Sequence, residues 1–275
     1  MSPLPILDKL TDDEFAFFKA IVYREAGIKL SDMKVALLQS RIMRRMRALQ
    51  ISTFRDYRNY LNDYYQDEIV DFINAVTTNK TEFLRENKHF DFMLSTALPN
   101  FEKSNREEIR IWSAGCSTGE EPYSIAVTCC EYFNKNKIPV KILATDIDTQ
   151  VLIQGYTGIY PKNTIDVFTP TIQQRYFNAI NTEKGVQYQI VPEVKKMITF
   201  KRLNLLDNTY PMRKKFDIIF CRNVIIYFDK DTQRVLFEKM YNYIADDGFL
   251  FIGHSENLSG VNSNFKSVGH TIYRK

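Results

Sequence analysis

The sequence predicts an α/β protein in which a doubly wound parallel sheet, carrying a small antiparallel β insertion, follows an all-α N-terminal domain. Residues 11 to about 76 contain only helical patterns. From residue 109 onward, short apolar runs alternate with helical segments, which is the βαβ pattern of a parallel sheet. We therefore place the helical domain at residues 1–78, a linker at 79–94 and the sheet domain at 95–275, with the insertion at about 176–200.

The composition is that of a globular protein. The chain has 275 residues, of which 44% are hydrophobic, and its net charge of +4 by itself implies neither a nucleic-acid nor a membrane partner. The first ten residues, MSPLPILDKL, lack the pattern of a signal peptide, and no run approaches the roughly 18 apolar residues of a membrane span. The four cysteines show no CxxC spacing. We expect a cytoplasmic monomer with reduced thiols.

The helical domain is predicted chiefly from one amphipathic segment, Leu30 to Leu49. Its apolar residues fall within one narrow sector at about 100° per residue, namely Val35, Leu38, Ile42, Met46 and Leu49. Ser31 occupies the position of an N-cap. Further helices are expected at Thr53–Leu61 and at about 66–76.

Four arginines gather toward the end of that segment: Arg41, Arg44, Arg45 and Arg47. One explanation is a solvated face that complements the helix dipole. The other is a docking face for an acidic partner, since four cations exceed what a helix end requires. The sequence leaves both open. An RNA partner ranks lower, because no aromatic-interleaved basic platform accompanies the cluster.

The histidines argue against metal and triad chemistry. His89, His254 and His270 lie far apart in the sequence, with no HExxH motif and no cysteine partners at ligand spacing. No GxSxG nucleophile motif is present either. We therefore expect no metal site, and we expect each histidine to be a surface residue or a hydrogen-bonded core residue.

Five apolar runs predict the core strands of the sheet: IRIWS (109–113), KILATD (141–146), ITFKRL (198–203), FDIIFC (216–221) and FLFIG (249–253). Helices are expected between them at Thr149–Gly155 and Asp231–Ile244. The last stretch, residues 265–274, alternates like an edge hairpin. The insertion is predicted from a Lys-Gly turn between β-prone runs.

The loop after the first strand, AGCSTGEEPYS, indicates the type of ligand. Gly115 and Gly119 allow close approach of backbone and ligand, as in dinucleotide-binding loops. The spacing is GxxxG rather than GxGxxG, and Glu120 and Glu121 open the following helix. Carboxylates at a helix N-terminus oppose a bound phosphate. A nucleoside that carries cationic groups is favoured instead, and S-adenosylmethionine has both an ammonium and a sulfonium.

The second predicted strand ends at Asp146, where an acidic side chain in this architecture accepts hydrogen bonds from ribose hydroxyls. Asp148, two residues further on, competes for that role. A reading without any ligand also exists, in which the glutamates stabilise the helix dipole and Asp146 caps the next helix. The order of glycine loop and strand-end aspartate favours the ligand-binding reading.

Several tracts together resemble the CheR-type chemotaxis receptor methyltransferases: WSAGCSTGEEPYSIA, ATDID, NLLD, FCRNVIIYFDKDTQ and FLFIGHSENL. The N-terminal LTDDEFAFFKAIVYREAGIKL is similar to that family's helical domain. The resemblance implies a class I methyltransferase (Rossmann-like) sheet. It also implies S-adenosylmethionine as cofactor, S-adenosylhomocysteine as product, and glutamate side chains of cytoplasmic receptor helices as substrate.

Site residues follow from the resemblance by position. The family pattern puts cofactor contacts at Asn79, Thr81, Arg85, Gly115, Glu121, Asp146, Asn204, Leu205, Arg222 and Asn223. Glu121 is implied to face the cofactor's amino group, and Asp146 its ribose. Arg222 and Tyr227 are implied as the catalytic pair. A competing interpretation makes Asn79 and Glu82 a helix capping box.

A carboxylate substrate is already ionised near neutral pH, so the implied reaction requires no general base, in keeping with a site that offers no histidine. The resemblance also implies that the insertion docks a receptor's C-terminal peptide in some members. Two alternatives stay open: an adaptor that binds S-adenosylmethionine without catalysis, and a methyltransferase acting on RNA.

Overall fold

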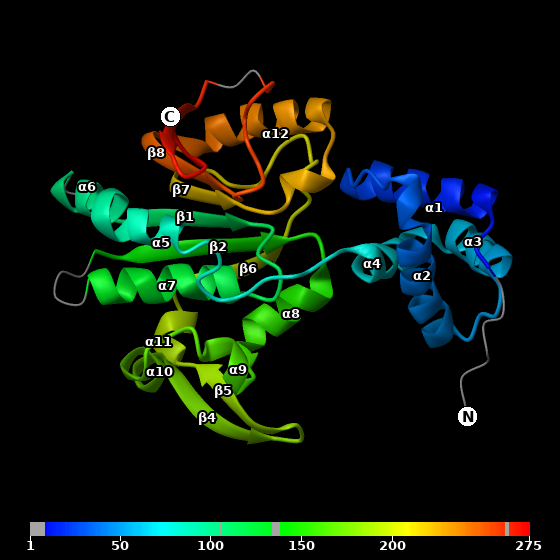
Figure 1. The fold of residues 1–275 in the computed structure, drawn as a ribbon, viewed down its shortest axis with the longest axis horizontal. Coiled ribbons are helices and arrows are strands. Elements are labelled where there is room, and N and C mark those ends of the chain that lie inside the picture. The colour runs from blue at the N-terminus through cyan, green and yellow to red at the C-terminus, as the bar shows by residue number, and fades with distance from the viewer. Residues whose placement is uncertain (1–8, 105, 134–137, 262–263) are drawn as a thin grey trace.

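The computed structural model describes residues 9–104, 106–133, 138–261 and 264–275. Most of the N-terminal segment MSPLPILDKL, to which the signal-peptide prediction applies, lies outside these ranges. The chain forms a helical domain, a large mixed sheet covered by helices, and a small second sheet (Figure 1). Within the described ranges, no helix is long and apolar enough to cross a membrane.

Four helices build the N-terminal domain: α1 (Asp12–Ala26), α2 (Val35–Leu49), α3 (Phe54–Asp63) and α4 (Tyr65–Val76). Helix α1 begins with a capping box between Thr11 and Glu14, and it ends at Gly27 in the left-handed conformation. The apolar faces of the four helices enclose one core, which includes Phe18, Ile42 and Tyr57. The predicted helical domain is thus confirmed.

The predicted cap at Ser31 is wrong. A single 3-10 turn, η1 (Asp32–Lys34), separates Ser31 from α2, and the Ser31 side chain accepts no capping hydrogen bond. Asp32 is instead paired with Lys19 of α1, with 2.6 Å between the two side chains. A serine next to an aspartate also occurs ahead of isolated turns, so this pattern does not by itself identify a helix N-cap.

The large sheet has the order β6-β2-β1-β7-β8-β10-β9. Its strands are β1 (Ile109–Ala114), β2 (Val140–Asp146), β6 (Ile198–Arg202), β7 (Phe216–Cys221), β8 (Ile244–Ile252), β9 (Lys266–Gly269) and β10 (Ile272–Arg274). The first five are parallel, and β10 pairs antiparallel with β8. The chain runs from β1 outward to β6 and then returns to β7, so the switch point lies between β1 and β7.

Helices cover both faces of this sheet. One face carries α5 (Lys88–Phe92), the π-helical η2 (Met93–Ala97), α6 (Leu98–Lys103), α7 (Glu120–Tyr132) and α8 (Thr149–Thr157), and the other carries α12 (Lys230–Tyr243) (Figure 1). The central strand β1 contributes apolar side chains to both sides of the sheet. Ile109 and Ile111 pack in the core on the side of α7, and Trp112 and Ala114 pack in the core on the side of α12. Apolar side chains are therefore needed on both sides of β1.

The predicted antiparallel insertion is confirmed, with different bounds. It is a three-stranded sheet in the order β3 (Ile159–Tyr160), β5 (Gly185–Ile190) and β4 (Phe177–Thr182). Short helices accompany it: α9 (Lys162–Ile165), α10 (Pro170–Tyr176) and α11 (Pro192–Lys195). The predicted range of about 176–200 missed β3, because two residues are too few to show alternation. It also included the first residues of β6, which belong to the large sheet.

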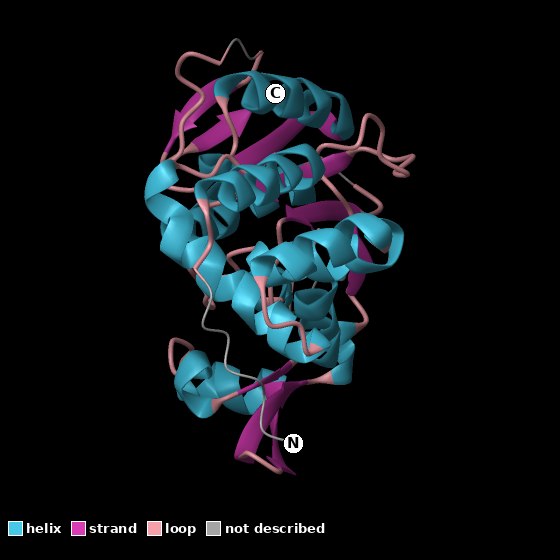
Figure 2. Cartoon of the chain, turned by 90° about the vertical axis from the view of Figure 1, so that its right-hand side faces the viewer, coloured by secondary structure: helices cyan, strands magenta, loops and turns pink. Residues whose placement is uncertain are grey.

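Hydrogen bonds from three segments join the helical domain to the sheet domain. Asn74 exchanges two hydrogen bonds with Thr149 at the start of α8. The Asn204 side chain donates to the Glu25 carbonyl over 2.7 Å. The Lys29 amide donates to the carbonyl of Tyr227 over 2.8 Å. The helical domain therefore lies against the carboxyl ends of the parallel strands, and Figure 2 shows its helices in front of the sheet.

Candidate functional site

A pocket lies where the helical domain, the linker and the carboxyl ends of β1, β2, β6 and β7 meet. This is the switch point at which open α/β sheets bind ligands. All the predicted cofactor and catalytic residues line it, namely Asn79, Thr81, Arg85, Gly115, Glu121, Asp146, Asn204, Leu205, Arg222, Asn223 and Tyr227. The helical domain adds Lys34 and Arg41 to the wall.

The glycine loop after β1 is shaped by its protein neighbours. Gly115 has a φ of 81°, and a Cβ at this position would lie 2.4 Å from Cγ2 of Val224 in the loop after β7. At Gly119, with a φ of 97°, a Cβ would lie 2.9 Å from the Gly155 Cα atom. Both glycines are therefore needed for the loop to pass between neighbouring elements.

Only one of the two carboxylates that open α7 belongs to the pocket. Glu121 lines it, accepting hydrogen bonds from Ser113 Oγ over 2.7 Å and from Arg222 Nε over 2.8 Å. Glu120 is buried beside Thr118 and does not line the pocket, and burial raises its pKa. The expectation of two carboxylates facing a ligand is corrected to one, and that one already has a cationic partner.

Asp146 and Asp148 have different roles. Asp146 lines the pocket and accepts the backbone N–H groups of Ser117 over 2.8 Å and of Asp148 over 3.0 Å. Burial raises its pKa to about 6. Asp148 is buried, caps α8, and accepts hydrogen bonds from Thr77 and Asn79. Asp148 therefore does not compete for the ligand, and Asp146 does not cap the helix.

The linker is irregular where it crosses the pocket. No helix begins at Asn79, so the capping-box interpretation is wrong. The Asn79 side chain donates to Asp148 over 2.6 Å, and its carbonyl accepts from Ser117 Oγ over 2.9 Å. Arg85 donates to the Lys80 carbonyl over 3.0 Å. The linker is thereby fixed against the loops after β1 and β2.

Arg222 is held from several directions. Its side chain is only 2% exposed. Nε donates to Glu121, and Nη1 donates to the Arg85 carbonyl over 2.7 Å and lies 2.8 Å from His89 Nδ1. The rings of Phe90 and Phe220 flank the guanidinium at 5.7 and 5.6 Å. The buried cation is thus paired and hydrogen-bonded, as burial of a charge requires.

Tyr227 and Asn204 both belong to the pocket wall. Lys34 Nζ stands 5.8 Å from the centre of the Tyr227 ring, and both residues line the pocket. Asn204 uses its side chain to donate to Glu25 and to accept from the Leu206 amide. Leu205 beside it is buried. Sequence patterns gave no signal for Lys34, which reaches the pocket from the η1 turn.

The four arginines of α2 separate into three environments. Arg41 lines the pocket and donates to the Val76 carbonyl and to Thr78. Arg45 is bound within the helical domain by Glu68 and Asp71, at 2.5 and 2.8 Å. Arg44 and Arg47 are exposed. The two exposed arginines are therefore the members of the cluster that present their charge to solvent.

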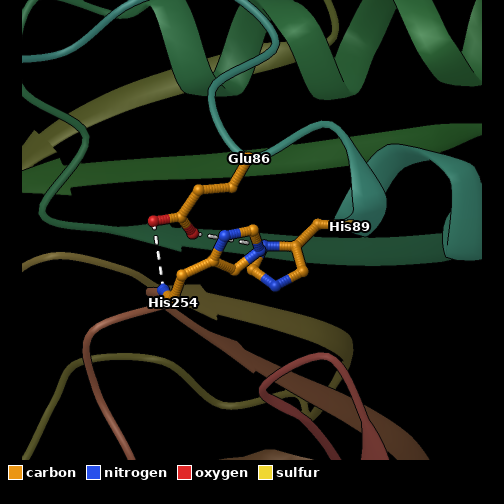
Figure 3. A group of neighbouring side chains, drawn as sticks. All are labelled: Glu86, His89 and His254. Carbon is orange, nitrogen blue, oxygen red and sulfur yellow. Dashed lines mark hydrogen bonds and ion pairs between the residues drawn. The ribbon is translucent and has the colours of Figure 1, made fainter.

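The fold brings His89 and His254 together beside Glu86, which the sequence did not predict (Figure 3). Their ligand atoms lie within 4.8 Å of one another, close enough to suggest a metal centre. However, both ring nitrogens of His89 have protein partners: Nδ1 faces Arg222, and Nε2 lies 2.9 Å from the His270 carbonyl. A metal at this position would have to displace a guanidinium. We therefore assign His89 and Glu86 to the network of polar contacts around Arg222, which His254 joins through its backbone N–H.

His89 makes stability dependent on pH. Burial, followed by the charge of Arg222, lowers its pKa to about 4, whereas an unfolded histidine titrates near 6.5. Between these values the unfolded chain binds a proton that the folded protein does not, so stability falls as the pH falls. We expect the His89 contribution to decrease by about 2 kcal/mol between about pH 7 and about pH 5.

Urea denaturation of the wild type and of His89→Asn at both pH values measures this contribution. The variant serves as the control, because Asp146 and the other carboxylates with raised pKa titrate equally in both proteins. Equal pH dependence in the two proteins would contradict the assignment.

The pocket lies at the switch point of an open α/β sheet and has a strand-end aspartate in its wall. Together with the match to a SAM binding domain, this identifies the fold as that of a class I methyltransferase that uses S-adenosylmethionine. The chain belongs to the CheR family. Residues 13–77 match the family's profile for the CheR methyltransferase all-alpha domain, and residues 79–274 match that for its SAM binding domain.

Relatives of similar length support this membership. The chain is 41% identical to a chemotaxis protein methyltransferase of Borreliella burgdorferi, over 97% of this chain and 95% of the relative. It is 38% identical to chemotaxis protein methyltransferase 2 of Pseudomonas aeruginosa, over 96% and 93%. It is also 38% identical to the Escherichia coli chemotaxis protein methyltransferase, over 96% and 91%. The expected family, enzyme class and cofactor are thus confirmed.

Proposed function

We propose that the protein transfers a methyl group from S-adenosylmethionine to glutamate side chains of chemotaxis receptors, giving γ-methyl esters and S-adenosylhomocysteine. The observation that carries this proposal is the convergence of all the predicted cofactor and catalytic residues on one pocket. The names of the relatives support a role in chemotaxis. Glutamate as the acceptor is the part inferred from the family resemblance.

The pocket residues suit distinct parts of the donor. We propose that Asp146 accepts hydrogen bonds from the ribose hydroxyls and that Asn204 and Leu205 flank the adenine; all three line the pocket. Glu121 is proposed to receive the amino group, because a carboxylate has about four acceptor positions and Ser113 and Arg222 use only two. Asn79, Thr81, Arg85, Gly115 and Asn223 complete the proposed cofactor wall.

The acceptor carboxylate requires no proton transfer, since it is ionised at neutral pH. Its oxygen forms a bond to the methyl carbon while the carbon–sulfur bond breaks, and the electron pair of that bond remains on sulfur. Positioning and exclusion of water supply the rate enhancement. We propose that Tyr227 orients the carboxylate, that Arg222 shapes the reaction site, and that Lys34 and Arg41 attract the substrate anion to the pocket.

The proposed partners are the acidic cytoplasmic helices of the receptors, met by Arg44 and Arg47, with the enzyme acting as a cytoplasmic monomer. Strand β4 is an edge strand of the small sheet. It thereby offers unpaired backbone groups for addition of a receptor's C-terminal peptide.

Incubation with methyl-labelled donor and receptor fragments tests the proposal. We expect the label to enter the receptor and to leave as methanol in base, which identifies an ester. Base-stable label would indicate amine methylation and would contradict a glutamate acceptor. Donor binding without transfer would favour the adaptor, and transfer to RNA but not to receptor would favour the second alternative.

The exposed arginines give a separate prediction. Reversing both charges, Arg44→Glu with Arg47→Glu, is expected to raise the KM for a receptor fragment about tenfold at low salt, with a smaller effect at high salt. Affinity for S-adenosylhomocysteine should not change. Arg55→Glu with Arg213→Glu makes the same charge change at other exposed positions. An equal rise in KM in both double variants would show that net charge, rather than the α2 face, is responsible.

A further inference from the structure

The guanidinium of Arg222 has two fixed nitrogens and one that is left for the pocket. Nε is bound to Glu121, and Nη1 is bound to the Arg85 carbonyl and to His89. Nη2 makes no hydrogen bond to any residue in the parts of the chain that the structure describes. Since Arg222 lines the pocket, the orientation of its planar group depends on the partners of the other two nitrogens.

His89 is suited to hold Nη1 because its tautomer is fixed from the other side. A carbonyl oxygen can only accept, so Nε2 of His89 carries the proton that is donated to His270 O over 2.9 Å. Nδ1 then has a lone pair directed at Arg222 Nη1, 2.8 Å away. The ring is fully buried and packs edge-on against Phe251, which restricts its rotation.

The surroundings keep this ring neutral. Burial and the charge of Arg222 oppose protonation, while Glu86 and the His270 carbonyl favour it, and His254 opposes it. The pKa of about 4 shows that the opposing effects dominate. A protonated ring would turn a second N–H toward the guanidinium and break the contact with Nη1. A neutral acceptor is therefore maintained throughout the physiological pH range.

We propose that His89 is a positioning residue, which accepts a hydrogen bond from Arg222 Nη1 at Nδ1 and so directs the free edge of the guanidinium into the pocket. The ligand group this edge would meet is the carboxylate of the methyl donor, which S-adenosylhomocysteine also carries, since a planar guanidinium with unpaired N–H groups binds carboxylates. The identity of the ligand in this inference rests on the proposed function, whereas the contact between His89 and Arg222 does not.

His89 also connects the site to the C-terminal strands. His270 and Thr271 form the turn between β9 and β10, and both have left-handed φ angles of 53° and 57°. Thr271 Oγ1 lies 3.1 Å from His89 Nε2 and donates to the carbonyl of Ile252 at the end of β8. The turn at the edge of the sheet thus fixes the tautomer of a residue that contacts Arg222.

Two substitutions separate the two hydrogen bonds of the ring. In His89→Asn the amide oxygen replaces the Nδ1 acceptor but does not reach His270. In His89→Gln the amide nitrogen reaches His270, but the acceptor for Arg222 is lost. We expect His89→Gln to lower kcat/KM for the donor and the affinity for S-adenosylhomocysteine about tenfold, the effect of losing one hydrogen bond to a buried charge. His89→Asn should stay within about threefold of the wild type.

We would measure affinity by calorimetry with S-adenosylhomocysteine and stability by thermal unfolding. In the wild type, ¹⁵N NMR of the histidine rings shows which nitrogen carries the proton. Equal losses in both variants would assign His89 a structural role only, and no loss in His89→Gln would remove it from the site. An NMR spectrum with the proton on Nδ1 would also overturn the proposal. A wild type that binds S-adenosylhomocysteine but methylates no receptor would refute the proposed function, while the affinities would still decide the role of His89.

Discussion

Replacing Arg222 with leucine is expected to destabilise the protein by about 3–5 kcal/mol and to abolish methyl transfer. Glu121 is buried, and Arg222 is its cationic partner at 2.8 Å. The substitution leaves a carboxylate in a pocket wall without its counter-charge, and it also leaves the Arg85 carbonyl without the donor at 2.7 Å. Urea unfolding measures the loss of stability, and transfer of labelled methyl to receptor fragments measures the activity.

A double variant tests whether the unpaired Glu121 carboxylate causes this destabilisation. Adding Glu121→Gln to Arg222→Leu removes the unpaired charge, so we expect it to recover part of the stability while transfer stays absent. The Glu121→Gln variant alone should destabilise less than Arg222→Leu, because the remaining arginine keeps its bonds to Arg85 and His89. If the double variant is no more stable than Arg222→Leu, the buried carboxylate is not the origin of the destabilisation.

The elements that the sequence predicts well are those whose periodicity reports burial. Strand β1 carries apolar side chains on both faces because helices cover both sides of it, and Ile109, Ile111 and Trp112 in the run IRIWS indicate this. Helix α2 shows its buried face, which includes Leu38, Ile42 and Met46, in the spacing of its apolar residues. Strand β3 has only two residues and produces no alternating pattern, so the sequence does not indicate where the small sheet begins.

Charged residues are harder to assign, because their role depends on distant partners. Arg44 and Arg45 are neighbours in the sequence, yet Arg44 is exposed and Arg45 pairs with Glu68 and Asp71 of α4. No local feature distinguishes them. The same holds for His89, whose partners lie in the loop after β7 and in the β9–β10 turn. Motif resemblance could place Arg222 at the pocket, but not the histidine that holds it.

Asp146 and Asp148 show that the position of a carboxylate along the backbone determines its role. Both follow the apolar run of β2, and either carboxylate satisfies the sequence pattern. Asp148 is the N-cap of α8, and its carboxylate also accepts hydrogen bonds from Thr77 at the end of α4 and from Asn79 in the linker. Asp146 remains at the strand end, where the pocket begins.

The Asp146→Ala substitution is expected to weaken binding of S-adenosylhomocysteine about 100-fold, because two hydrogen bonds from ribose hydroxyls to a carboxylate are lost together. Calorimetry measures the affinity, and Arg44→Ala with Arg47→Ala, which changes only exposed side chains, should bind as the wild type does. If the exposed-arginine variant and Asp146→Ala bind equally well, the ribose assignment is wrong.

The pH dependence of S-adenosylhomocysteine affinity is an independent test of the role of Asp146. Burial raises the pKa of Asp146 to about 6, so its carboxyl gains a proton as the pH falls below that value and loses an acceptor for the ribose. Wild-type affinity should therefore decline below about pH 6, and Asp146→Ala should show no such decline. A decline of the same size in both proteins would point to another group, of which Glu120 is a candidate because its pKa is also raised by burial. Since Glu120 does not line the pocket, Glu120→Gln is expected to leave the decline intact, which distinguishes the two carboxylates.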